Sequence, residues 1–405
     1  MRRPVEPGEH LCRRFYTGPR GHPSLPPGVY FRCLFIGFFD GLDSERGIAW
    51  RVADSLSLRK FLGYGLDETT PDHSTLSRTR RLLWVSTHQA VFRWVLRLLK
   101  DDGLLTGKTI AIDATTLEAN AAMRSIVRRD TGEGYDAYVR RLAEAAGLPH
   151  LTREALARFD RKRKKKGSNR EWTSPDDPDA RITKMKDGRT HLAHKAEHAV
   201  DLSSGALVAI TLQPADTGDT TSVTSTLAAA QRAVRSVGLP PIQEGVLDKG
   251  YHSGSVLVAL HEGSVRSYVA DPKRTGRRWA GKDARVEQAQ LYANRRRLRG
   301  SRNKRLQAKR AELSERSNAH LYETGGMRRV HLRGRDNILK RLVIHGAGFN
   351  LALLMRTGFG VGTPRGLQGR LLSLCRLFGR LTGFTGVPYP RAHRFLASPR
   401  RVAFR

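Results

Sequence analysis

The 405-residue sequence is poor in cysteine, in acidic residues and in long apolar runs. Its three cysteines, Cys12, Cys33 and Cys375, show no CxxC spacing, which excludes a disulfide framework or a cysteine zinc site and fits a reducing compartment. The longest apolar stretches, around residues 31–39 and 349–355, are too short to span a bilayer. The N-terminus lacks the apolar core of a signal peptide. We therefore expect a cytoplasmic protein.

Acidic residues are scarce relative to basic ones. The chain has 38 Asp and Glu against 72 Lys and Arg, a formal net charge of +34. This excess is larger than a solubilising surface needs, and it predicts a polyanionic partner, because neutralising phosphates releases their counterions. A ribosome-associated protein and a genome that favours arginine codons are alternative explanations. Charge alone indicates nucleic acid but does not decide the question.

Proline, glycine and charge patterns divide the chain into four parts. Residues 1–28 contain six prolines and are predicted to form a flexible arm. Residues 29–100 have helical periodicity. Residues 101–356 are predicted to alternate strands with helices, interrupted by basic insertions near 147–180 and 271–310. The last part, 357–405, is a basic, glycine-rich tail.

Two helix starts stand out in the N-terminal part, at Ser44–Gly47 and Pro71–Ser74. A turn containing Gly63 and Gly65 lies between them, which makes a helix-turn-helix plausible. A plain helical bundle with a solvated arginine face is the alternative. In the helix that follows Pro71, the residues predicted to face inward are Leu76, Leu82 and Leu83. Those predicted to face outward, as candidates for base contacts, are Arg78, Arg80 and Arg81.

The central part has the pattern of an α/β domain. Strands are predicted at Thr109–Asp113, Ala196–Leu202, Leu207–Gln213, Gly245–Asp248 and Ser267–Ala270. Helices are predicted at Tyr135–Ala146, Ser222–Val237, Ser253–Glu262, Glu312–Tyr322 and Asp336–Met355. Ser203-Ser204-Gly205 is a hairpin signal, so a mixed sheet is favoured. A doubly wound parallel sheet competes with it, but no GxGxxG or GxxxxGK[ST] loop supports nucleotide binding.

Two of the predicted strands end on a carboxylate, Asp113 and Asp248. Burying an acid is costly unless the acid is paired or holds a metal, and clustered acids without a metal raise each other's pKa. Mg²⁺ prefers carboxylate oxygens, and a pair of ions can assist phosphodiester chemistry. A third acid is needed, and Glu315 is the first candidate, with Glu312 and Glu323 as rivals.

A second group of possible ligands is His191, His194 and His198. On a helix these histidines would share a face and could bind zinc. The alternation of residues 196–210 instead predicts a hairpin, which would scatter their side chains, and no HExxH motif is present. We therefore favour strand-edge or DNA-facing histidines over a zinc site.

Two basic runs are candidates for phosphate contacts. Residues 161–166 are all Arg or Lys and belong to a predicted exposed insertion that continues to Asp179. In positions 295–310, nine of sixteen residues are Lys or Arg. Such residues contact backbone phosphates without reading sequence. The candidates are Arg161, Lys162, Arg163, Lys164, Arg295, Arg296 and Arg297.

Four segments together resemble a bacterial insertion-sequence transposase with an RNase H-like, DD-E catalytic domain. They are Asp43–Arg81, Gly107–Arg129, Val246–Ser253 and Glu315–Asn350. With the strands between them, the resemblance covers roughly residues 29–356. It implies an RNase H-like mixed-sheet domain preceded by a small helical DNA-binding domain.

The resemblance also implies roles for individual residues. Asp113 and Asp248 match the two catalytic aspartates, the second within an Asp-Lys-Gly-Tyr signature, and Glu315 matches the catalytic glutamate of a Glu-Arg signature. The three would bind two Mg²⁺ ions, for which Mn²⁺ would substitute. The implied partners are the terminal inverted repeats of the element, target DNA and a second copy of the chain in a dimer.

Two positions depart from the pattern of the family. Asn318 stands where an aromatic residue is usual, and Tyr322 stands where the Tyr-Arg-Glu-Lys pattern has its lysine. The expected activity is cleavage at the 3′ ends of the element followed by strand transfer. The alternatives are an RNase H-like nuclease that cuts without joining and a decayed transposase that only binds and represses.

Overall fold

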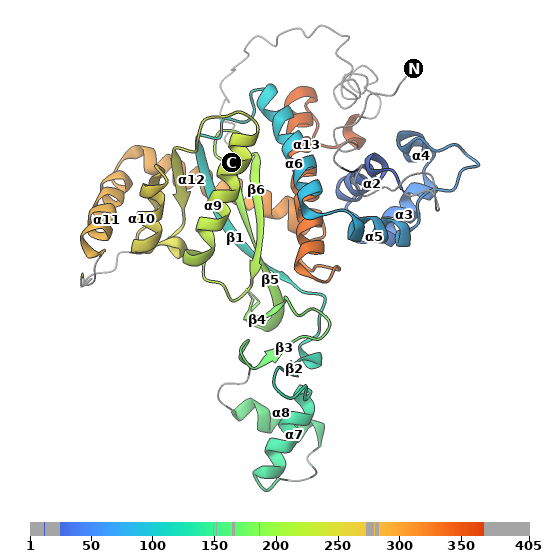
Figure 1. Cartoon of the computed structure of the whole chain (residues 1–405), viewed down its shortest axis with the longest axis vertical. Helices are drawn as coiled ribbons and strands as arrows, with labels where there is room; N and C mark the ends of the chain where they lie inside the picture. Colours follow the sequence, from blue (N-terminus) through green and yellow to red (C-terminus); the bar gives the residue numbers. More distant parts are fainter. Residues whose placement is uncertain are drawn as a thin grey trace, which may run out of the picture.

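The computed structural model describes residue 12 and residues 25–367, except 149, 151, 164–166, 186, 273–278 and 280–282. Most of the predicted arm and tail lie outside the described residues, as does Lys164. The described chain combines helices with a mixed sheet, so the predicted α/β class is confirmed. A group of N-terminal helices lies to one side of the sheet and a narrow extension projects from its end (Figure 1).

The N-terminal region is helical. Its helices are α2 (Pro27–Phe39), α3 (Glu45–Asp54), α4 (Leu56–Leu62), α5 (His73–Leu82) and α6 (Val85–Asp101). Both predicted starts are confirmed: the Ser44 side chain accepts from the Gly47 amide at 3.1 Å, and Asp72 accepts from the Thr75 amide at 2.6 Å. Each bond satisfies a backbone donor that the first helical turn leaves without a partner.

The main sheet has six strands, β1 (Thr109–Glu118), β4 (Arg181–Lys184), β5 (Thr190–Asp201), β6 (Leu207–Pro214), β7 (Glu244–Leu247) and β8 (Arg266–Val269). Their order is β4-β5-β1-β7-β8, and β6 pairs with β5. The β1–β5 and β5–β6 pairs are antiparallel, as the predicted hairpin requires, and Gly205 supplies a positive φ of 83° in its turn. The β1–β7 and β7–β8 pairs are parallel, which gives a mixed sheet.

Helices cover both faces of this sheet. Helix α9 (Asp219–Ser236) packs on β5, β6 and β1, and its Thr226 hydroxyl contacts Thr211 of β6 at 2.6 Å. The opposite face carries α12 (Ser301–Asn318) and α13 (Arg335–Phe359). Helices α10 (Gly254–Glu262) and α11 (Ala284–Leu298) flank the β7–β8 side. The sheet is thus buried between helices, as a mixed sheet of apolar strands requires.

Helix α13 is the one described helix long and apolar enough to cross a membrane, but 89% of its apolar window is buried inside the fold. It packs along α6 and α2 on one side and β6 on the other. Asn350 fixes it to β6 through two bonds to Leu207, at 2.8 and 2.9 Å. The helix is therefore the core element that joins the N-terminal helices to the sheet.

The narrow extension is formed by η2 (Met123–Ser125), β2 (Val127–Arg128), α7 (Tyr135–Ala145), α8 (Arg153–Lys162) and β3 (Trp172–Thr173). Helix α7 confirms the predicted helix at 135–146. The insertion was predicted to be exposed through Asp179, and this is wrong in part: Trp172 is 1% exposed and Asp177 is completely buried. Trp172 packs edge-on against Tyr135 and Tyr138, which gives the extension a small core of its own.

Two predicted boundaries are corrected. The first strand does not end at Asp113, because β5 continues to pair with β1 as far as Glu118. The stretch 295–310, predicted only as part of a basic insertion, is largely helical: it comprises the end of α11 and the start of α12, since Arg and Lys are good helix formers. The last described element is the short helix η5 (Arg365–Leu367).

Candidate active site at the acidic edge of the sheet

Asp113 and Asp248 lie at the same end of neighbouring strands. The parallel register pairs Ile112 with Leu247, and each aspartate is the next residue along its own strand. Adjacent strands are about 5 Å apart, so the two backbones present their carboxylates side by side. We call this place, defined by Asp113 and Asp248, the acidic edge. Strand β1 runs on past it, whereas β7 ends there.

Both aspartates are partly exposed and held by short backbone bonds. Asp113 Oδ1 accepts from the Ala114 amide at 2.9 Å. Asp248 Oδ1 accepts from the Gly250 amide at 2.7 Å and caps η3 (Lys249–Tyr251). The turn that follows β7 therefore fixes the Asp248 carboxylate at the sheet edge while leaving it accessible to solvent.

Glu315 lies on the helix that crosses the same face as Asp113. Asp113 pairs with His198 across β1 and β5, so both side chains point to one face of the sheet. The His198 ring contacts the Ser317 hydroxyl of α12 at 3.3 Å. Glu315 itself is exposed, next to the buried side of the helix at Ser314 and Ser317. The helix that carries it packs on β1 and β7.

His198 holds this helix in place as a neutral ring. The Ser317 hydroxyl donates to the Ser314 carbonyl, so it can accept from His198 Nδ1, and Nε2 then accepts from the Tyr322 hydroxyl. Burial lowers the pKa of His198 to about 3, which keeps the ring uncharged. Tyr322 lies in η4 (Ala319–Thr324), a π-helical turn, and such turns are frequent at functional sites.

The rival acids are engaged elsewhere. Glu312 pairs with Arg316 one turn along α12, at 2.5 Å, and Glu323 pairs with Arg328. The described residues contain no group of three or more His, Cys, Asp or Glu side chains arranged to hold a metal. The structure thus brings Asp113 and Asp248 together, and the place of Glu315 as their third partner stays a prediction.

Sequence reasoning missed a buried polar network beneath the acidic edge. Glu197 of β5 is completely buried, and it accepts from Thr226 at 2.5 Å, from Ser222 and, at 3.4 Å, from Tyr251. Tyr251 is the tyrosine of the Asp-Lys-Gly-Tyr signature, and its pKa is raised by burial and by Glu197. The signal was present in Lys195 and Glu197, two charged residues in the middle of a mostly apolar strand.

His191 lies on the opposite face of β5 from His194 and His198, because side chains alternate along a strand. His194 is buried against Asp177 at 2.9 Å, and His198 contacts Tyr322. His191 is partly exposed and contacts Asp187 at 3.0 Å. Each therefore has a local partner at a different place in the fold.

The basic candidates differ in how far their side chains are exposed. Arg80 was predicted to face outward, and this is wrong: it is 9% exposed and forms an ion pair with Glu45 of α3. Arg163 bonds Asp160 at 2.9 Å, Arg295 bonds Asp271 at 2.6 Å and Arg297 bonds the Ser267 carbonyl at 2.8 Å. The exposed members are Arg78, Arg81, Arg161, Lys162 and Arg296.

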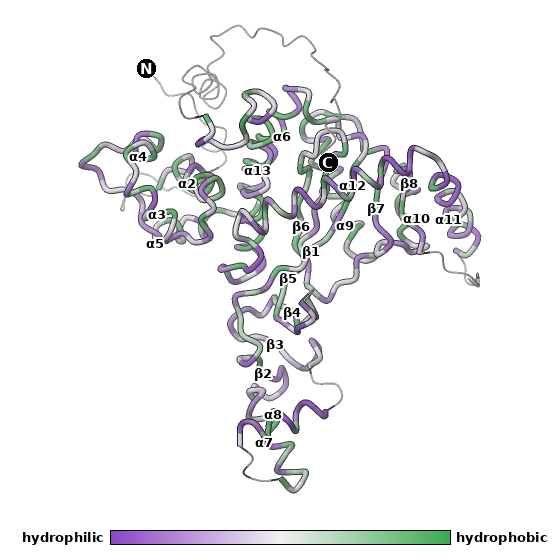
Figure 2. Tube along the Cα trace, turned by 180° about the vertical axis from the view of Figure 1, so that it is seen from behind, coloured by the Kyte–Doolittle hydropathy of each residue, from purple (hydrophilic) through white to green (hydrophobic). Residues whose placement is uncertain are grey.

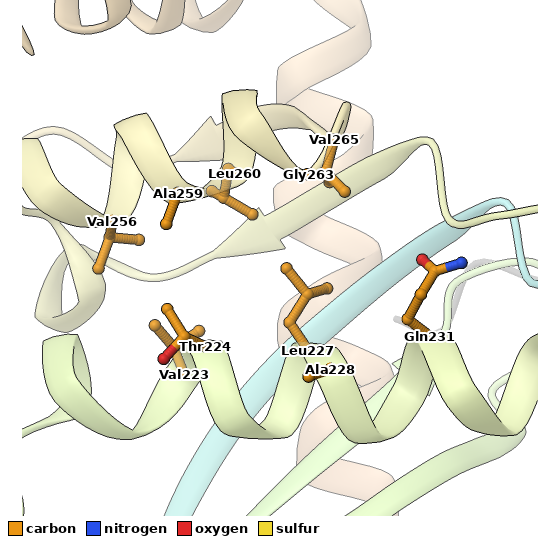
Figure 3. Close-up of a pocket in the computed structure, with 10 residues that line it drawn as sticks. All are labelled: Val223, Thr224, Leu227, Ala228, Gln231, Val256, Ala259, Leu260, Gly263 and Val265. Atoms are coloured by element: carbon orange, nitrogen blue, oxygen red, sulfur yellow. The ribbon is translucent and has the colours of Figure 1, made fainter.

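A pocket between α9 and α10 differs from the acidic edge in the chemistry of its lining residues (Figure 3). Apolar side chains such as Leu227 and Val256 line it, and its polar lining residues are Thr224 and Gln231. None of the ten residues around it is ionisable. It offers no group for acid–base or metal chemistry, so the acidic edge is the candidate active site.

Comparison with known proteins adds one finding about the N-terminal region. Residues 4–82 match a family model described as Transposase domain (DUF772). This match supports a transposase family. It covers α2 to α5, the helices that stand beside the sheet. No curated protein and no solved structure matches the chain at a significant level.

Proposed function

We propose that the protein is a DNA transposase that cuts the ends of its own element and joins them to target DNA. The observation that carries the proposal is the in-register pair Asp113 and Asp248, together with the transposase-domain match at residues 4–82. The sheet supports it as well. Three antiparallel strands, β6, β5 and β1, are followed by the parallel strands β7 and β8, which is the strand arrangement expected of an RNase H-like domain.

The acidic edge has the donor chemistry for magnesium. Asp113 and Asp248 offer partly exposed carboxylates whose Oδ1 atoms accept from backbone amides, and hard cations prefer such oxygen ligands. Asp113, Asp248 and Glu315 would hold Mg²⁺, which when bound activates the attacking oxygen and neutralises charge on the phosphate. Glu315 would complete the set from α12, the helix that His198 secures over the same face.

The remaining work falls to the chain's own residues. The exposed basic side chains of α8 and α11, Arg161, Lys162 and Arg296, would contact DNA phosphates. In the N-terminal helices, Arg78 and Arg81 are the exposed arginines of α5, which would act as the recognition helix of a helix-turn-helix. The buried network around Glu197 would hold the Tyr251 turn, and with it the direction of the Asp248 carboxylate. Two copies of the chain would pair the element's ends.

The test is the Asp248→Asn variant, compared with the wild type on paired element ends and a target plasmid. We expect cleavage in Mg²⁺ or Mn²⁺ to fall by more than about 100-fold, since even outer partners of metal ligands are worth 10–100-fold. Affinity for the ends should stay within about twofold, because Asp248 lies outside the helices α2 to α5. Full cleavage by the variant would overturn the proposal. If the wild type gives nicked products without joined ones, a nuclease is favoured instead.

A further inference from the structure

Lys195 is a buried cation one strand away from the acidic edge. It lies on β5 and is 5% exposed. Its Nζ contacts Asp219 at 2.6 Å, Ser222 at 2.8 Å, the Thr217 carbonyl at 3.1 Å and Glu197 at 3.2 Å. Removing an ammonium group from water costs several kcal/mol, so this lysine depends on its anionic partners. Its strongest partner by distance is Asp219.

Asp219 extends from this ion pair toward Asp248. It is the first residue of α9, and its Oδ1 holds Lys195. Its other oxygen, Oδ2, lies 2.9 Å from the point where a Cβ would stand on Gly250. Oδ1 of Asp248 lies 3.0 Å from that same point. The two carboxylates therefore flank Gly250, and only a residue without a side chain leaves room for both.

Two negative groups this close repel each other unless a cation compensates one of them. Lys195 supplies that compensation from the far side of Asp219. The same lysine holds Glu197, which contacts the Tyr251 hydroxyl at 3.4 Å. The two acids held by Lys195 thus approach the turn 248–251 at two points: Asp219 lies beside Gly250, and Glu197 contacts Tyr251.

We propose that Lys195 and Asp219 are positioning residues for Asp248. The Asp219 side chain packs beside the turn 248–251. Lys195 fixes the orientation of the Asp219 carboxylate and offsets its charge. The Asp248 carboxylate then stays directed toward Asp113 instead of turning away from the negative charge of Asp219. The inference rests on the proposed function, in which Asp248 holds a divalent cation.

The test uses the full-length Asp219→Asn variant, which keeps the shape of the side chain and removes its charge. Lys195 then keeps Glu197 as its anionic partner but loses the charge of Asp219, and the surroundings of Asp248 become more positive. We therefore expect Mn²⁺ added alone to bind 10–100-fold more weakly in a calorimetric titration. Cleavage at saturating DNA should fall with the metal occupancy and recover at higher Mn²⁺. Affinity for the element's ends should not change.

Asp136→Asn is the matched control. Asp136 lies in the first turn of α7, so its variant also loses a favourable charge at a helix start, but in the narrow extension. Its Mn²⁺ affinity should equal that of the wild type. Gly250→Ala is a second variant that leaves Lys195 and Asp219 intact: its Cβ would press on both carboxylates, and it should weaken Mn²⁺ binding in the same way. It decides the matter if Asp219→Asn does not fold.

The outcomes separate the two proposals. If Asp219→Asn or Gly250→Ala binds Mn²⁺ like the wild type, the positioning role is overturned, even where the melting temperature falls. If Asp248→Asn cleaves DNA normally, the proposed function fails first. If only Asp248→Asn loses cleavage and metal binding, the proposed function stands and the positioning role is rejected.

Discussion

The N-terminal helices and the acidic edge of the sheet differ in which of their predicted functional charges stay exposed. In the helices, a basic side chain predicted to reach DNA turns inward: Arg80 pairs with Glu45, and its backbone carbonyl accepts from Lys340 of α13. At the edge, the two aspartates stay partly exposed while the charges behind them, Lys195 and Glu197, are buried and mutually satisfied. Buried pairs in both regions support a structure, and the side chains left in solvent are the ones available for function.

The largest expected effect tests the exposed side of this comparison. Glu315→Gln should lower metal-dependent end cleavage by more than about 100-fold, because it removes a proposed ligand and not merely an outer partner. Glu312→Gln on the same helix is the matched control, since Glu312 is exposed and paired with Arg316. It should cleave within about twofold of the wild type. Equal activity of both variants in a cleavage assay would remove Glu315 from the site.

The next largest expected effect concerns the Arg80–Glu45 ion pair in the N-terminal helices. Arg80→Met removes the ion-pair partner of the largely buried Glu45, and breaking a buried pair costs about 3–5 kcal/mol in the free energy of unfolding. Arg81→Met, at the exposed neighbouring position, should change that free energy by no more than about 0.5 kcal/mol. Urea unfolding of the two variants measures the difference.

The same two variants should behave in the reverse order toward DNA. Arg81→Met should weaken end binding and reduce the slope of log affinity against log salt by about 1, as expected for one lost phosphate contact. Folded Arg80→Met should keep the wild-type slope. If Arg80→Met changes the slope and Arg81→Met does not, the buried arginine is the one that reaches DNA and the comparison is wrong.

The parts of the fold that sequence patterns predicted are those set by local rules. The caps at Ser44 and Asp72 and the hairpin turn at Gly205 depend on a few adjacent residues. The two aspartates could be found because a carboxylate that follows an apolar strand is conspicuous. Their shared register could not be derived, because it depends on how β7 pairs with β1, which are far apart in the sequence.

What the sequence concealed depends on tertiary partners. Leu82 was predicted inward and is 42% exposed, whereas Arg80 is buried, because Glu45 on another helix neutralises it. Asp219 precedes the predicted helix 222–237 and was not singled out as a candidate, because its approach to Gly250 appears only when α9 lies on the sheet. A charge pattern in one element does not show which opposite charge the fold will bring to it.

The smallest expected effect tests whether His88, a buried polar residue of the N-terminal helices, stays uncharged. His88 of α6 donates from Nδ1 to the Trp84 carbonyl at 2.9 Å, so Nε2 accepts from the Tyr30 hydroxyl at 3.1 Å. Burial lowers the pKa of His88 to about 4, and the nearby charges of Lys340 and Arg80 act in the same direction. The ring is therefore neutral in the folded protein.

Because the folded pKa lies below the unfolded value of about 6.5, the stabilising contribution is complete above pH 6.5 and decreases as the pH falls toward 4. Between pH 7 and pH 5 the loss of stability attributable to His88 should be roughly 2 kcal/mol.

Urea unfolding of the wild type and of His88→Phe at both pH values isolates this contribution, since other buried histidines contribute equally to both proteins. His73→Phe, at an exposed position, is the matched control for the substitution itself. A His88→Phe protein that loses as much stability as the wild type over this interval would mean that His88 takes up its proton without unfolding. The helices would then hold a buried charge that nothing compensates, unlike the sheet, where Lys195 has its acids. The tube in Figure 2 shows α6 beside α13, whose Lys340 is one of the charges near His88.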